Sequence, residues 1–106
     1  MFEDIMDLDV ERTKSLSDLL FYCKLENVEI NKVRLYKQGY LVEFKGVPGN
    51  AILHNGSYGK TSYLWETMEM PWDNKDVSVH SAEVLAHLLG ALSRNEDWNK
   101  VLRSDS

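Results

Sequence analysis

The sequence predicts an α+β domain with an N-terminal helix, an antiparallel meander of four or five strands, and a C-terminal helix packed on one face of the sheet. Three observations predict this. Apolar residues recur at helical spacing near the start, alternate with polar residues from Lys32 onward, and return to helical spacing after Ser81. Because the chain has 106 residues, we expect one domain, with a helix over 1–24, a sheet over 32–80 and a helical end over 81–102.

The first helix carries an apolar stripe that faces one side of a helical wheel. Its members are Phe2, Ile5, Met6, Val10, Leu16, Leu19, Leu20 and Cys23. Asp9 and Thr13 interrupt the stripe, so one continuous helix or two helices broken near residue 13 both satisfy the pattern. Phe21 and Leu25 lie off the stripe, which indicates either a second covered side or an absent partner. Cys23 shares its spacing with leucines and is predicted to be a buried structural thiol.

Four or five strands follow. Residues 33–37 and 40–45 alternate around a turn at Gln38-Gly39, which predicts a hairpin. Residues 51–54 form a short third strand and 62–70 a fourth, expected to be the longest. A loop over 70–76 precedes a fifth strand at 77–80.

The C-terminal part is predicted to be helical. Ser81 can cap a helix in which Leu85, Leu88, Leu89 and Leu92 form the buried face. Residues 96–102 can add one short helix. No repeat or linker divides the chain.

The acidity of the chain belongs to its first part. Residues 1–18 hold six acids and two bases, which accounts for −4 of the net charge of −5. Such a segment repels phosphate backbones and attracts basic protein surfaces, so we expect a protein partner with a basic surface and no direct nucleic-acid binding. The alternative is a solvated helix face. The acids chosen as contact candidates are Glu3, Asp4, Asp7 and Glu11.

Localisation is predicted to be cytoplasmic. The acidic start lacks the basic residues of a secretory signal, and no apolar run approaches the roughly 20 residues that a membrane span needs. No membrane partner is therefore expected.

No pattern nominates a catalytic, cofactor-binding or metal-ligating residue. The segment 54–61 ends in Gly-Lys-Thr like a phosphate-binding loop, but His54 stands where the first glycine is needed and residues 62–65 read as a strand. His87 has Glu83 one turn before it, which predicts an exposed helix pair rather than a zinc site. The chain is accordingly expected to be no enzyme, with no cofactor.

Large aromatic side chains gather around the predicted fourth strand. Trp65 shares a strand face with Tyr63, while Tyr58 and Trp72 lie in turn-rich loops at opposite ends of the strand. Two hypotheses remain open: Trp65 belongs to the core with Trp72 folded over the sheet, or Tyr58, Trp65 and Trp72 form a contact surface.

Residues 39–92 resemble a group of small bacteriophage and prophage accessory proteins. The resemblance depends on Ser57-Tyr58-Gly59, then Leu64-Trp65-Glu66, then a strand at 77–79 that leads into the helix at Ser81. The segment 60–63 departs from that pattern. The resemblance implies no activity, but it implies a phage setting in the host cytosol, in which small acidic proteins often inhibit host or defence proteins.

Together these observations favour a small acidic protein-binding module, with inhibition of a host or defence protein as its role. A homo-oligomeric structural or assembly component that self-associates through Phe21 and Leu25 is the first alternative. A small-ligand or nucleotide binder at the loop Gly56–Lys60 is the second.

Overall fold

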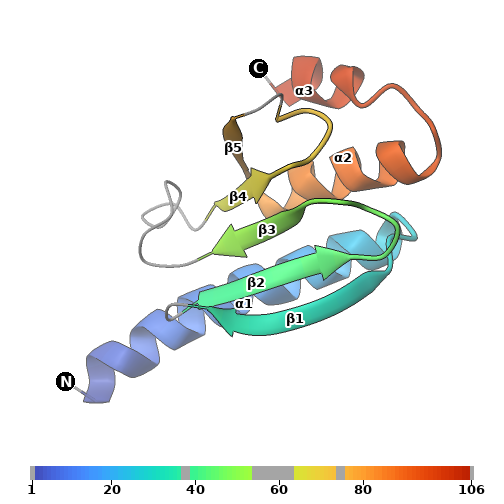
Figure 1. Cartoon of the computed structure of the whole chain (residues 1–106). Coiled ribbons are helices and arrows are strands. Elements are labelled where there is room, and N and C mark those ends of the chain that lie inside the picture. Colours follow the sequence, from blue (N-terminus) through green and yellow to red (C-terminus); the bar gives the residue numbers. More distant parts are fainter. Residues whose placement is uncertain (1, 37–38, 54–63, 74–75, 106) are drawn as a thin grey trace.

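The computed structural model describes the backbone of residues 2–36, 39–53, 64–73 and 76–105, and side chains from residue 13 to residue 103 within these ranges. The described residues form an N-terminal helix, a five-stranded antiparallel sheet and two C-terminal helices, arranged as in Figure 1, so the predicted α+β class is confirmed. The elements in chain order are α1 (Phe2–Leu25), β1 (Ile30–Tyr36), β2 (Gly39–Phe44), β3 (Asn50–Leu53), β4 (Trp65–Met68), β5 (Val77–His80), α2 (Ala82–Ser93) and α3 (Asn99–Asp105).

The two longer helices end in the same way. α1 runs without a break through residue 13, so the one-helix alternative is the one that the structure shows. After α1, Asn27 has a φ of 61°, and the Val28 N–H donates to the Cys23 carbonyl at 2.8 Å. After α2, Asn95 has a φ of 57°, and the Glu96 N–H donates to the Ala91 carbonyl at 2.8 Å. Both are Schellman ends, in which asparagine tolerates the left-handed conformation that closes the last turn.

The start of α2 confirms the predicted cap. The Ser81 hydroxyl accepts a hydrogen bond from the Val84 N–H at 3.2 Å, which satisfies one of the free donors of the first turn. Leu85, Leu88 and Leu89 are fully buried as predicted, whereas Leu92, the fourth residue of the predicted face, is only half-buried.

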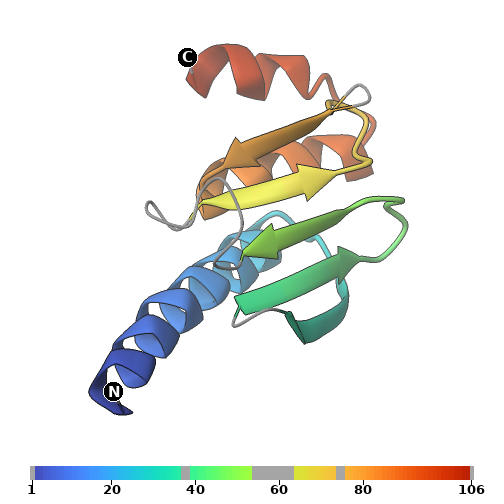
Figure 2. The ribbon, with the colours of Figure 1, turned by 60° about the vertical axis from the view of Figure 1, so that its left-hand side comes forward.

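Each strand pairs antiparallel with the next, and the sheet order is β1-β2-β3-β4-β5. Figures 1 and 2 show α1 and α2 side by side on one face of this sheet. The core lies between the two layers. Its members are Leu19 and Cys23 from α1, Leu85, Ala86 and Leu89 from α2, Met70 from the loop after β4, and Val42, Phe44, Ala51, Leu53 and Trp65 from the sheet.

The other face of the sheet has no helix over it in the described part of the chain (Figure 1). Leu41 and Ile52 are cross-strand partners on this face and are still more than 90% buried. Met68 and Val79, nearer the β5 edge, keep 37% and 36% of their surface exposed. The exposure of side chains on this open face is therefore uneven: it is low on β2 and β3 and higher on β4 and β5.

The prediction for the fourth strand is wrong at its C-terminal end. β4 stops at Met68, because Glu69 adopts a φ of 64°, which is incompatible with an extended strand. That turn sends Met70 into the core, where it is 3% exposed. At the N-terminal end of the predicted strand, Leu64 precedes β4 and is not part of it, and residues 62–63 lie outside the described residues. Among the described strands β1 is the longest, with seven residues.

The N-terminal part of α1 extends beyond the sheet in both views (Figures 1 and 2). A helix of 24 residues is about 36 Å long, which is longer than the layer it covers. None of the described helices is both long enough and apolar enough to cross a membrane.

Candidate functional site

The four acidic contact candidates lie in the part of α1 that extends beyond the sheet. Glu3, Asp4, Asp7 and Glu11 all belong to the helix Phe2–Leu25. The structure describes the backbone at these positions, and it places them together on a single projecting element (Figure 2). Whether they contact a partner stays a prediction.

The three aromatic candidates do not form one surface. Trp65 is 0% exposed and lies in the core, so the core alternative is the one that the structure shows and its ring cannot reach a partner in this conformation. Trp72 is half-buried and packs edge-on against Trp98, with ring centroids 6.0 Å apart. Tyr58 and the whole loop Gly56–Lys60 lie outside the described residues.

Trp72 covers a polar cluster that holds the loop after β4. The carboxylate of Asp73, which is 6% exposed, accepts hydrogen bonds from the Thr67 hydroxyl at 2.9 Å, the Met70 N–H at 3.1 Å and the Ser78 hydroxyl at 2.5 Å. The Trp72 indole N–H donates to the Thr67 oxygen at 3.1 Å. Three donors satisfy the carboxylate, so the cluster fixes residues 69–73 against β4 and β5.

The same cluster contains serine, histidine and aspartate, but not in a catalytic order. The Ser78 hydroxyl lies between Asp73 and His80, 2.7 Å from Nε2 of the imidazole. In a nucleophilic triad the imidazole lies between hydroxyl and carboxylate and accepts the hydroxyl proton. Here that proton is donated to Asp73, which leaves Ser78 to accept a hydrogen bond from His80. The arrangement supports a structural role for these three residues.

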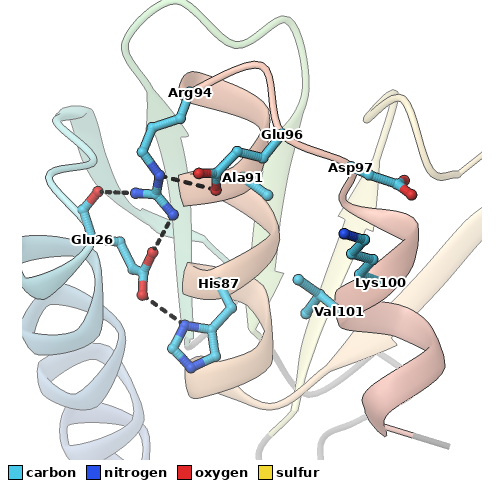
Figure 3. A pocket seen from close by; sticks show the side chains of 8 residues that line it. All are labelled: Glu26, His87, Ala91, Arg94, Glu96, Asp97, Lys100 and Val101. Carbon is cyan, nitrogen blue, oxygen red and sulfur yellow. Dashed lines mark hydrogen bonds and ion pairs between the residues drawn. The ribbon is translucent and has the colours of Figure 1, made fainter.

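A second cluster joins α1 to α2. Glu26, just after α1, places one carboxylate oxygen 2.9 Å from a guanidinium nitrogen of Arg94 and the other 2.8 Å from Nδ1 of His87 (Figure 3). Arg94 also donates to the Glu26 backbone carbonyl at 3.0 Å and to the Glu96 carboxylate at 3.1 Å. Gly90 makes room for this contact, because a Cβ at that position would collide with the Glu26 side chain.

The electrostatics of Glu26 reflect two opposing effects. Burial raises the pKa of its carboxyl, but the hydrogen bonds and charges of Arg94 and His87 outweigh this and hold the pKa below its ordinary value of 4.5. Glu26 is therefore a carboxylate at neutral pH, paired on both oxygens.

This ionic cluster borders a pocket of about 600 Å³ beside α2, lined by Glu26, His87, Ala91, Arg94, Glu96, Asp97, Lys100 and Val101. Figure 3 shows Asp97, Lys100 and Val101 on the far side of α2 from Glu26. Glu26 pairs with Arg94 and His87, and this connects the end of α1 to α2. Glu96 pairs with the same Arg94. These groups do not form a set aimed at one ligand.

Sequence spacing found only the weaker partner of His87. The predicted pair with Glu83 is present, but its closest nitrogen–oxygen distance is 3.9 Å. The closer partner, Glu26, comes from 61 residues earlier in the chain. No local pattern connects these two positions.

Cys23 matches its prediction. It is fully buried, and burial, with a smaller effect of the Glu26 charge, raises the pKa of its thiol to about 12. A thiol with that pKa is a poor nucleophile at neutral pH.

Exposed apolar side chains occur on α1 and β1. Phe21 and Leu25 are 58% and 64% exposed, and Leu35 on β1 is 83% exposed. Val33 on β1 and Leu20 on α1 are also exposed. Phe21 and Leu25 stand one helical turn apart on the same side of α1. These are the two residues that lie off the apolar stripe.

Comparison with protein-family models, with curated proteins and with solved structures finds no match for this chain.

Proposed function

We propose that this chain is a small acidic protein-binding module. The observation that carries the proposal is the patch formed by Phe21 and Leu25 on α1, two large apolar side chains that are more than half exposed. Single exposed apolar residues are ordinary, but two that are adjacent on a helix surface and turned away from the core are typical of a contact site.

Charge defines the kind of partner. The first 18 residues carry −4 of the net charge of −5, and most of them lie where α1 extends beyond the sheet (Figure 1). A partner that packs an apolar group on Phe21 and Leu25 and carries Lys or Arg toward Glu3, Asp4, Asp7 and Glu11 satisfies both features. We place this partner among bacterial host or defence proteins, in the phage setting that the resemblance implies, with inhibition as the role.

The experiment begins with a partner identified by affinity purification from a bacterial lysate and mass spectrometry. Its affinity is then measured against the wild-type chain, the variant Phe21→Ser/Leu25→Ser, and a control, Lys14→Ser/Lys24→Ser, which changes two exposed residues of the same helix. We expect the first variant to lose at least about tenfold in affinity. Two apolar side chains that become buried in the interface should contribute more than about 1.4 kcal/mol to the binding free energy. The control should keep or gain affinity.

Salt tests the electrostatic part. Affinity should fall as the salt concentration rises from about 0.05 M to 0.5 M, because screening weakens contacts between exposed charges. An affinity that is independent of salt would show that the acidic segment does not contribute to binding. Equal losses in both double variants remove the apolar patch.

A homo-oligomeric structural or assembly component is the second candidate, because a second copy can also cover Phe21 and Leu25. Light scattering distinguishes the two. A monomer over a hundredfold range of concentration contradicts the homo-oligomer, whereas a dimer that dissociates on Phe21→Ser/Leu25→Ser supports it.

A further inference from the structure

The two edges of the sheet differ in how they are protected. β5 is an edge of only four residues. β1, the other edge, has seven residues, five of which are exposed, and in the described part of the chain it pairs with β2 alone. An edge strand presents backbone N–H and C=O groups to solvent, and a long one can accept a further strand.

The side chains of β1 divide cleanly between its two faces. Val33 and Leu35 pair with Val42 and Tyr40 on the helix-covered face, and they are 40% and 83% exposed. Lys32 and Arg34 pair with Glu43 and Leu41 and point to the open face. The edge therefore shows apolar groups on one side and positive charges on the other.

Charge limits the registers in which a second copy of β1 can pair with this edge. When two identical strands pair antiparallel about a twofold axis, cross-strand partners share a face. Centring the pair on Lys32 or on Arg34 sets that residue against its own copy, and centring it on Val33 sets Lys32 against Arg34 twice. Like charges directly opposite one another destabilise a strand pair, so charge disfavours these three registers. A self-pair centred on Leu35 sets Arg34 against Tyr36 and has no such conflict.

An acidic strand removes this conflict. In the described residues neither Lys32 nor Arg34 forms an ion pair with another side chain. A segment with two acids separated by one apolar residue sets its carboxylates against Lys32 and Arg34. The same register brings its apolar residue to the face of Val33 and Leu35, whose exposed surface it then covers.

We infer that the edge of β1 binds an extended segment of a partner protein in which acidic residues alternate with apolar ones, and that this segment adds to the sheet as a sixth strand. The inference rests on the proposed protein-binding function. It gives that function a second contact, distinct from the apolar patch on α1 and opposite in charge to the acidic segment of that helix.

Two labelled nine-residue peptides test the inference directly. One alternates glutamate with valine, and the other has lysine in place of each glutamate. Fluorescence anisotropy measures their affinity for the wild-type chain, for Lys32→Glu/Arg34→Glu, and for a control, Lys24→Glu/Lys100→Glu, which changes the net charge equally at exposed positions elsewhere. Circular dichroism confirms that each variant is folded.

We expect the wild-type chain and the control to prefer the acidic peptide. The variant Lys32→Glu/Arg34→Glu should lose about tenfold for that peptide and gain for the basic one, because two attractive cross-strand pairs become repulsive. Amide chemical shifts in the wild-type chain should change chiefly at residues 30–36. Equal binding of both peptides, the same loss in the control, or shift changes centred elsewhere would overturn the inference.

Other occupants and the failure of the proposed function give different results. A wild-type dimer whose concentration-dependent amide shift changes centre on residues 30–36 contradicts charge selection at this edge. A protein partner that binds this variant with unchanged affinity but loses affinity for Phe21→Ser/Leu25→Ser overturns the inference while leaving the proposed function intact. If the acidic peptide binds at β1 but Phe21→Ser/Leu25→Ser binds the protein partner with unchanged affinity, the inference stands and the proposed contact on α1 fails.

Discussion

The two ends of the sheet use their large side chains differently. At the β4–β5 end, Trp65 is buried and Trp72 packs on Trp98 above the Asp73 cluster. Leu35 on β1, the strand at the other end, and Phe21 on α1 remain mostly exposed. Aromatic packing therefore marks the internally bonded β4–β5 end, and the most exposed apolar side chains lie on β1 and α1. Four variants test this contrast.

Trp65→Ala should have the largest effect on stability. Removing a fully buried indole leaves a large cavity, and the free energy of unfolding should fall by about 3–5 kcal/mol in urea denaturation. Trp65→Phe is the matched control. The Trp65 indole N–H has no hydrogen-bond partner among the described residues, so phenylalanine keeps most of the ring and removes an unpaired donor. A fall in the free energy of unfolding of Trp65→Phe as large as that of Trp65→Ala would contradict this account.

Asp73→Ala should rank second, with a loss of about 2–3 kcal/mol, because it leaves the Thr67 hydroxyl and the Met70 N–H without their acceptor in a buried site. Asp76→Ala, an exposed carboxylate in the same loop, serves as the comparison. Thermal melts of the two variants should differ by several degrees, and equal melting temperatures would show that the buried cluster does not stabilise this end.

Glu26→Gln should cost about 1 kcal/mol at pH 7, since it weakens the hydrogen bonds to Arg94 and His87. The lowered pKa of Glu26 sets the pH dependence. A carboxyl whose pKa is lower in the folded state stabilises the fold above its unfolded value of 4.5, and this stabilisation is lost as the pH falls through the folded-state pKa. The difference between wild type and variant should therefore shrink below about pH 4.5. A difference independent of pH would contradict the pairing.

Phe21→Ser/Leu25→Ser should have the smallest effect on stability, within about 0.5 kcal/mol, because exposed side chains contribute little to the fold. The same variant is expected to lose partner affinity, which separates a contact role from a folding role. A loss of 2 kcal/mol or more would show that these side chains support the core and would remove the contrast between the two ends.

Local sequence patterns predicted the elements well where neighbours in the chain decide the structure. The strand Val77–His80, the Ser81 cap and the leucine face of α2 are confirmed, because spacing and capping act over one or two turns. The same holds for Cys23, whose spacing with leucines indicated burial. The fourth strand was extended too far because nothing in Met68-Glu69-Met70 signals that a non-glycine residue takes a positive φ.

The sequence by itself determined the class of the fold, the position of most helices and strands, and the concentration of negative charge before residue 18. Only the tertiary structure decided which of two hypotheses applies to Trp65, which residue pairs with His87, and which edge of the sheet stays open. The physical reason is distance along the chain. Periodicity and caps depend on adjacent residues, whereas the Glu26–His87 pair and the burial of Trp65 depend on segments that meet only when the helices pack on the sheet.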